Sequence, residues 1–210
     1  MIIKLNDVTK SYGERKIIDN ISMEIKEGEF VAIMGKSGAG KSTILNIIGL
    51  LETIDTGKVI IDGEEDIKPN SRRSTAILRK KISYLFQNFA LIDEETVYYN
   101  LLIAIKYLKG SKNFKITKIS EALAKVGLEG FEKRKIFELS GGEQQRVAVA
   151  RIILKPSKIV LADEPTGSLD EGNRDMIINL LRMLNDKGKT VVLVTHDKSV
   201  SEHCDRVINL

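Results

Sequence analysis

The sequence holds a single cysteine, Cys204, so no disulfide can form within the chain, and a reducing compartment fits this best. No apolar run is long enough to cross a bilayer. Residues 1–7 lack the basic start and the long apolar core of a secretory signal peptide. We therefore expect a cytosolic chain that reaches a membrane only through a partner. Cys204 itself we expect to be a small packed residue, because no catalytic arrangement surrounds it in the sequence.

The composition is that of an ordinary soluble globular protein. Hydrophobic residues make up 42% and charged residues 30% of the 210 positions, which suffice for a domain with a large core. The formal net charge is +4. This mild charge suits a protein that binds polyanionic nucleotides or works near an anionic membrane, but it demands neither.

The most informative stretch fits G-x-x-x-x-G-K-[ST], the pattern of a phosphate-binding loop. It consists of Gly35, Lys36, Ser37, Gly38, Ala39, Gly40, Lys41 and Ser42. A short apolar run before it predicts a buried strand, and residues 43–51 after it predict a helix. In this context Lys41 can reach the β- and γ-phosphates of a nucleotide, and the Ser42 hydroxyl can hold Mg²⁺. A glycine-rich turn that binds nothing is the alternative, which the flanking elements disfavour.

Hydrophobic periodicity along the chain predicts alternating strands and helices. The predicted strands lie at residues 2–8, 16–25, 30–34, 57–63, 82–86, 158–162, 190–195 and 207–210. The predicted helices lie at residues 43–51, 72–81, 95–108, 116–126, about 143–154, 171–185 and 197–203. A turn is expected at residues 11–14 and a polar loop at residues 64–70.

This order of elements predicts one α/β domain. Its core, at about residues 1–87 and 156–210, should hold a mainly parallel sheet and an N-terminal antiparallel β subdomain. A helical subdomain at about residues 88–155 should be inserted into that core.

Two carboxylates, Asp163 and Glu164, end the hydrophobic strand predicted at residues 158–162. Parallel sheets carry ligands at the carboxyl edge of their strands. Asp163 therefore suits Mg²⁺ or its waters, and Glu164 could polarise a water aimed at a γ-phosphate. A solvated acidic turn is the alternative, and the phosphate loop elsewhere in the chain makes it the weaker one.

A second anion site is conceivable at residues 139–146, which read Leu-Ser-Gly-Gly-Glu-Gln-Gln-Arg. Ser140, Gly141 and Gly142 precede a helix, so their backbone N–H groups and the serine hydroxyl could face an anion. A helix N-cap without a ligand is an equally good interpretation from the residues alone.

The predicted helix at residues 72–81 is basic, and a nucleic-acid patch is conceivable there. Its cations are Arg72, Arg73, Arg79, Lys80 and Lys81. A solvated helix face is favoured, because aromatic residues do not alternate with these cations. We therefore expect no nucleic-acid partner.

Together these residues resemble the ATP-binding cassette (ABC) ATPases over nearly the full chain. Residues 139–146 resemble the signature sequence of that family, and Gln87 lies where its Q-loop glutamine would lie. Ser168-Leu169-Asp170 resembles the D-loop, and His196 resembles the switch histidine. Details at residues 33–35, 86–89 and 162–167 resemble the macrolide-export and lipoprotein-release branch, and residues 84–93 also resemble ATPases of bacteriocin exporters.

The resemblance implies a P-loop NTPase (RecA-like) core and a role for each matching residue. Tyr12 would stack on adenine, the loop through Ser42 and Thr43 would hold ATP, and Ser42, Gln87 and Asp163 would hold Mg²⁺. Glu164, His196, Gln87 and Lys41 would serve hydrolysis. Ser140, Gly141 and Gly142 of a second copy would cap the γ-phosphate, and Asp170 would link the two sites. His203 has no such role.

The same resemblance implies partners: a head-to-tail homodimer formed on ATP binding, an integral-membrane permease and an extracytoplasmic adaptor. The chain would then lie at the inner face of the cell membrane as the motor of an exporter for a peptide, lipoprotein or drug-like substrate. A non-transport ATPase that signals through a membrane partner, as in cell division, shares every catalytic residue and remains the alternative. The acidic residues 93–95 depart from relatives, and a basic docking segment on the permease is one hypothesis for them.

Overall fold

The computed structural model describes residues 1–167 and 169–210 and is built on a five-stranded parallel sheet of order β6-β7-β8-β3-β9. The strands are β3 (Phe30–Met34), β6 (Ile82–Leu85), β7 (Ile159–Asp163), β8 (Thr190–Val194) and β9 (Arg206–Asn209). The first four are short, mostly apolar runs, because both faces of a parallel sheet are covered, whereas the edge strand β9 is largely exposed. The parallel core expected from the sequence is confirmed.

A second sheet, of order β2-β1-β4-β5, is antiparallel. Its strands are β1 (Ile3–Tyr12), β2 (Arg15–Ile25), β4 (Thr56–Ile61) and β5 (Glu64–Glu65). The turn predicted at residues 11–14 is wrong for its first half, because Tyr12 pairs with Arg15 and the strand therefore reaches Tyr12. The polar loop predicted at residues 64–70 is wrong at its start, because Glu64 pairs with Ile61.

Eight helical segments connect the strands in the part of the chain that the structure describes. They are α1 (Lys41–Ile48), α2 (Arg72–Lys80), α3 (Val97–Ala104), α4 (Lys112–Lys125), the 3₁₀ turn η1 (Ile136–Glu138), α5 (Gly141–Leu154), α6 (Glu171–Asp186) and α7 (Lys198–Ser201). The helix predicted at residues 95–108 is shorter, because the Thr96 side chain caps its first turn and the chain leaves helical geometry at Ile105.

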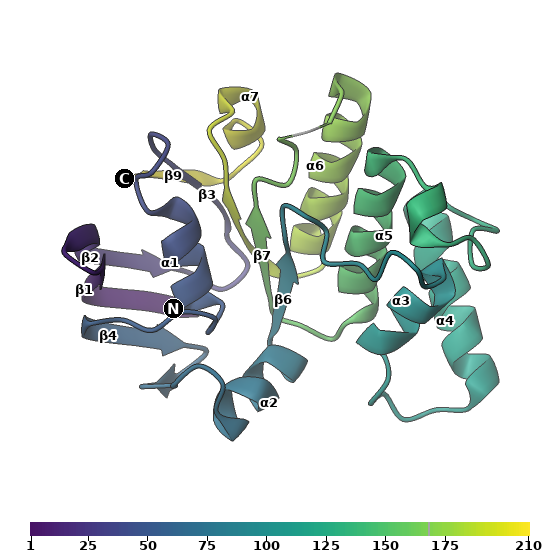
Figure 1. Cartoon of the computed structure of the whole chain (residues 1–210), viewed down its shortest axis with the longest axis horizontal. Coiled ribbons are helices and arrows are strands. Elements are labelled where there is room, and N and C mark those ends of the chain that lie inside the picture. Colours follow the sequence, from purple (N-terminus) through teal and green to yellow (C-terminus); the bar gives the residue numbers. More distant parts are fainter. Residues whose placement is uncertain (168) are drawn as a thin grey trace.

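Alternating side chains of the parallel sheet divide the core into two hydrophobic clusters. Val31 and Ile33 face α1 and the antiparallel sheet, whereas Phe30 and Ala32 face the cluster that includes helices α3 to α6. Figure 1 shows this as layers, with α1 on one side of β6 and β7 and with α5 and α6 on the other. The α5 helix thus starts on the opposite side of the sheet from the α1 helix.

The carboxyl ends of the parallel strands meet at one edge of the molecule, the upper edge in Figure 1. The loop into α1 leaves β3 there, and residues Glu164 and His196 follow β7 and β8 at the same edge. Ligands of such folds bind at this edge. In the described residues, no helix is both long and apolar enough to span a bilayer.

Candidate nucleotide-binding site

The loop between β3 and α1 is shaped by glycines that no other residue could replace without strain. Gly38 and Gly40 have φ angles of 78° and 86°, in the left-handed region. A Cβ added at Gly40 would also collide with Ile18 Cδ1 of β2. The loop therefore wraps closely over β2, with the first turn of α1 directly behind it.

Lys41 begins α1 and is buried, with 8% of its surface exposed. Its Nζ donates hydrogen bonds to the carbonyl oxygens of Gly35, at 3.0 Å, and Lys36, at 3.1 Å. These bonds hold the ammonium against the loop. The loop backbone is closed further by a bond of 3.1 Å from Ala39 N to the Lys36 carbonyl.

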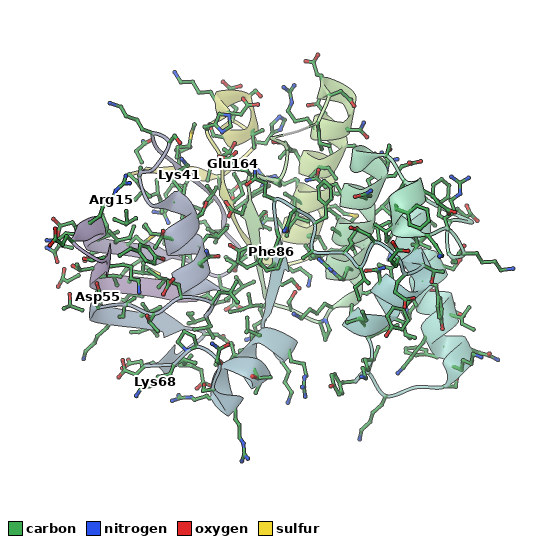
Figure 2. The ribbon with its side chains drawn as sticks, in the orientation of Figure 1. Arg15, Lys41, Asp55, Lys68, Phe86 and Glu164 are labelled. Carbon is green, nitrogen blue, oxygen red and sulfur yellow. The ribbon has the colours of Figure 1, made fainter. Side chains whose placement is uncertain are left out.

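A hollow of about 370 Å³ opens on this loop. Its lining consists of Tyr12, Arg15, Ile17, Ser37, Gly38, Gly40, Lys41, Ser42, Thr43 and Glu164. In Figure 2 the labelled side chains of Lys41 and Glu164 lie near each other at the edge where the strands end. A phosphate chain placed here would meet a buried cation and the positive end of a helix.

Ser42 and Asp163 meet across this edge, although 121 positions separate them in the sequence. The Ser42 hydroxyl donates to Asp163 Oδ1 at 2.9 Å. Burial, together with the nearby charge of Glu164, raises the pKa of the Asp163 carboxyl above its ordinary value, and the Ser42 bond and Lys41 oppose this only in part. A cation beside the Asp163 carboxylate would stabilise its charged form and so lower its pKa again.

The donor set at this point fits Mg²⁺. The Ser42 hydroxyl and the Asp163 carboxylate are hard oxygen ligands, which Mg²⁺ prefers. Among the described residues, no three His, Cys, Asp or Glu side chains form a metal cage. The chain thus offers few ligands, as expected for an ion that takes its remaining ligands from substrate phosphates and water.

Glu164 follows β7 in a left-handed backbone conformation, with φ 44°. Its backbone N–H donates to the Val194 carbonyl of β8 at 3.0 Å, which carries the sheet pairing one residue past the strand. The side chain reaches the neighbouring strand end, where His196 Nδ1 lies 3.0 Å from Glu164 Oε1. The His196 side chain is 71% exposed, whereas that of Glu164 is 17% exposed. The carboxylate is therefore held inside and the imidazole faces outward.

Gln87 lies in a turn after β6 and is exposed. It lines a second hollow, of about 640 Å³, together with Asn46, Phe86, Asn88 and Asp163. The structure thus places Gln87 and Asp163 in the lining of the same hollow. The amide of Gln87 can contact a ligand that occupies this hollow.

Tyr12 stands at the rim of the nucleotide hollow, and half of its surface, 50%, is exposed. Its hydroxyl donates to Glu52 Oε2 at 2.7 Å, and Glu52 also pairs with the buried Lys10 at 2.9 Å. These partners, Lys10 first, lower the pKa of the Glu52 carboxyl to about 2. The hydroxyl end of the ring is thereby held in place, and Lys10 Nζ lies 5.1 Å from the ring centre.

Residues 139–146 start α5, and each of the polar side chains at its end has a partner within the chain. Ser140 and Glu143 form a reciprocal cap, with Ser140 N donating to Glu143 Oε2 at 2.7 Å. Gln144 donates to the carbonyls of Ile136 and Leu139, and the buried Gln145 donates to the Pro165 carbonyl after β7. Helix α5 is thereby linked to the segment after β7, next to Asp163 and Glu164.

Arg146 connects the same helix to α6. Its Nη1 donates to Asn173 Oδ1 at 2.7 Å, while Asn173 Nδ2 donates to Asp170 Oδ2 at 2.6 Å. Asp170 is the N-cap of α6 and accepts from Asn173 N at 3.0 Å. Ser168, the first residue of the predicted D-loop, lies outside the described residues.

Ser140, Gly141 and Gly142 do not line the hollow that holds Lys41 and Ser42. They sit at the start of α5, and in Figure 1 helix α1 and helix α5 lie on opposite sides of the sheet. Within one chain, these two glycine-rich helix starts are therefore separate sites.

Sequence reasoning missed three contributors to this region. Arg15 lines the nucleotide hollow, but a lone arginine after a turn carries no motif that would reveal it. Gln145 and Asn173 act through contacts to residues 20 and 27 positions away, which no local periodicity predicts.

The fold and this constellation define a P-loop nucleotide-binding protein: a parallel sheet, a glycine loop on a helix start, and a strand-end acid that meets the loop serine. The model of the ABC transporter family matches residues 18–167. The chain belongs to the ABC transporter family.

Curated relatives agree with this membership. The chain is 38% identical over its whole length to the macrolide export ATP-binding/permease protein MacB of Escherichia coli, and 38% identical to that of Mannheimia succiniciproducens. It spans 33%, a third, of the length of each of these relatives.

Solved structures show the same fold. The structure described as dimeric MJ0796, a bacterial ABC transporter cassette, matches with a TM-score of 0.91 and 43% identity, over 99% of this chain and 94% of that one. The post-hydrolysis dimer of MJ0796 bound to ADP and Pi matches with a TM-score of 0.91 and 42% identity, over the same shares of the two chains. CbiO1 of Clostridium perfringens matches with a TM-score of 0.85 and 28% identity, over 99% and 84%.

Proposed function

We propose that this chain binds ATP with Mg²⁺ and hydrolyses ATP at the interface of a head-to-tail dimer. One protomer would supply the phosphate loop with Lys36, Ser37, Gly38 and Ala39, and its partner would supply the start of α5. Each closed dimer would then hold two equivalent sites, as a two-fold axis requires.

Gly141 carries this proposal. Its φ angle is not in the left-handed region, and a Cβ added there would meet nothing within 4 Å. Nothing within the chain therefore requires a glycine, which is a poor residue for a helix. Gly141 is also exposed. A glycine in this setting is suited to the close approach of a ligand to the backbone, and that ligand must come from outside the chain.

The chain's own residues fit the hydrolysis step. Ser42 and Asp163 would hold Mg²⁺, which neutralises phosphate charge when it is bound. Glu164 would accept a proton from the attacking water as its oxygen bonds to the γ-phosphorus and the bond to the β-phosphate oxygen breaks. His196, at 3.0 Å from Glu164, would orient that carboxylate. Gln87 would contact the water and Mg²⁺ from the hollow that it lines together with Asp163.

The remaining site residues would position ATP and couple the two halves. Tyr12 would stack on adenine, and Thr43 would contact the phosphates beside Ser42. Asp170 would reach across the dimer. Residues at about 88–155 would move as a helical unit with α5 when phosphate contacts form or are lost.

The direction of transport rests on the relatives. The MacB proteins are named as macrolide export ATP-binding/permease proteins, and this chain matches about a third of their length. We infer that the chain drives a membrane permease in export, from the inner face of the cell membrane, with an extracytoplasmic adaptor as a further partner. Co-purification of the native chain from detergent-solubilised membranes would identify that permease.

The dimer can be tested with Glu164→Gln, which preserves side-chain size but removes the group that accepts the proton. This variant should bind ATP, turn over very slowly and elute as a dimer in ATP, but as a monomer in ADP. Light scattering after gel filtration measures the mass directly. A variant that stays monomeric in saturating ATP, while it binds the nucleotide, would contradict the proposal.

Ser140→Arg in the Glu164→Gln background is the matched control. The arginine would fill the space that the partner's γ-phosphate must enter, while the phosphate loop of the same chain stays intact. The control should therefore bind ATP as a monomer and fail to dimerise.

A further inference from the structure

One stretch of the chain carries cations and exposed apolar side chains that the nucleotide site does not use. Residues 96–120 contain five lysines and no aspartate or glutamate. The same stretch holds exposed large apolar side chains, among them Tyr107 at 66%, Leu108 at 37%, Phe114 at 40% and Ile116 at 43%. Exposed apolar groups gathered in this way mark an interaction surface.

The stretch centres on the connection between α3 and α4. Lys106, Lys109 and Lys112 lie there and are exposed, and in the described part of the chain none of them forms a salt bridge. Lys118, by contrast, pairs with Glu121 at 2.9 Å. Lys115 Nζ donates to the Lys106 carbonyl at 3.0 Å, which ties the connection to α4. The free lysines therefore project from a connection that is anchored at its base.

The fold brings a cation of α2 next to the α3–α4 connection. Arg79, near the end of α2, stacks on Tyr107, with 4.0 Å between the guanidinium carbon and the ring centre. The sequence favours a solvated face for α2, because no aromatic residue alternates with its cations. In the fold, however, Tyr107 from the α3–α4 connection lies against Arg79. We call this the lysine surface: Arg79, Lys106, Tyr107, Leu108, Lys109, Lys112 and Ile116.

We propose that the lysine surface binds the headgroups of an anionic lipid bilayer. Lysines beside a membrane attract anionic lipids, and tyrosine lies readily at the boundary between headgroups and acyl chains. Leu108 and Ile116 suit shallow insertion below the headgroups. A nucleic acid would leave these aliphatic side chains without a partner, since its phosphates are polar and its bases stack on flat rings.

The position of the surface leaves the nucleotide site free. The α3–α4 connection and α2 lie at the lower edge in Figure 1, whereas α5 and α6 start at the upper edge. No residue of the lysine surface lines the hollow with Lys41 and Ser42. The inference rests on the proposed function only in that a permease would bring the chain to a bilayer.

Vesicle sedimentation of the full chain tests the surface. The probes are vesicles of phosphatidylcholine with phosphatidylglycerol and vesicles of phosphatidylcholine alone. The chain should sediment with the anionic vesicles only, and binding should weaken as salt increases. The triple variant Lys106→Gln/Lys109→Gln/Lys112→Gln should bind about 100-fold more weakly, since each lysine near such a surface contributes about fivefold.

A matched control replaces three exposed lysines elsewhere, at Lys26, Lys58 and Lys187, by glutamine. It has the same net charge as the first triple variant and should keep most of the vesicle binding. Tyr107→Ser/Leu108→Ser should also weaken binding, because insertion is lost while every lysine remains.

Several results would overturn the inference: no sedimentation with anionic vesicles, equal sedimentation with neutral ones, or an equal loss in both triple variants. Tighter binding to a duplex or single-stranded oligonucleotide than to the vesicles, unaffected by Tyr107→Ser/Leu108→Ser, would favour a nucleic acid instead. ATP-dependent dimerisation, measured on the same preparations, separates failure of this surface from failure of the proposed function.

Discussion

The side chain of Asn173 leaves no room for a residue larger than glycine at position 142. This allows a quantitative test of the contact between α5 and α6. A Cβ added at Gly142 would lie 2.8 Å from Asn173 Cγ and Oδ1. Asn173 cannot retreat without cost, because it accepts from Arg146 at 2.7 Å and donates to Asp170 at 2.6 Å. Gly142→Ala should therefore break the hydrogen bond between Arg146 and Asn173.

The magnitude follows from what Arg146 loses. Its Nε is already buried without a partner, so the Asn173 bond is an important contact of the guanidinium. A hydrogen bond to a charged group is worth about 1.5–3 kcal/mol, whereas alanine gains up to about 1 kcal/mol over glycine in a helix. Gly142→Ala should thus lower the free energy of unfolding by about 0.5–2 kcal/mol.

Asn173→Ala removes the side chain that blocks the space. In that background Gly142→Ala should be neutral or stabilising by up to about 1 kcal/mol, because only the helix propensity remains. Urea denaturation of the four proteins, followed by circular dichroism, gives the coupling between the two positions as a double-mutant cycle. A cost for Gly142→Ala that is the same with and without Asn173 would refute the steric link.

The other predictions concern separate parts of the molecule. Lys41→Ala should weaken ATP binding about 10- to 100-fold through the loss of one charge-assisted hydrogen bond, as isothermal titration would measure. Glu52→Gln should be less stable than the parent above pH 4.5, and the difference should shrink as pH falls from 4.5 towards 2, because the folded-state pKa of Glu52 is lowered to about 2. Equal stability of the two proteins at pH 7 would argue against a stabilising Lys10–Glu52 pair. Burial raises the pKa of the Cys204 thiol to about 12, so a thiol reagent should label the folded chain far more slowly than the unfolded chain at pH 8.

The sequence predicts the regular core of this protein well, because that core has strong periodicity. β3 coincides with its predicted range, and α5 ends at Leu154 as predicted. Helix α5 begins at Gly141, before its predicted start, because Ser140 caps it there. The errors fall at element ends. β1 reaches Tyr12 because pairing with Arg15 outweighs the turn signal, and α3 stops at Ala104 although the apolar rhythm continues.

The site is less visible in the sequence. Motifs identify Ser42, Asp163, Glu164 and His196 one by one, but the bond from Ser42 to Asp163 and the contact of Glu164 with His196 depend on strand order, which only the fold provides. Contacts such as Arg79 on Tyr107 join exposed side chains of distant segments. Such pairs leave no periodic pattern, so the contribution of Arg79 to the lysine surface could not be predicted, although the lysines of residues 96–120 stand in the sequence.

The most direct test of a site shared between two chains is complementation between two inactive variants. Lys41→Ala disables the phosphate loop, and Ser140→Arg disables the start of α5, so neither variant alone should hydrolyse ATP. In a head-to-tail pair, one site combines both defects and the other combines neither. An equal mixture should therefore regain up to about a quarter of the unmodified activity, since about half of the dimers are mixed and each has one intact site.

Mixing Lys41→Ala with a chain that carries both substitutions is the control, because no arrangement of that pair forms an intact site. Phosphate release, measured at protein concentrations where dimers form, should rise in the first mixture and stay at background in the control. A first mixture as inactive as its two components, or a Ser140→Arg protein that hydrolyses ATP normally by itself, would contradict a site completed by a second copy of the chain.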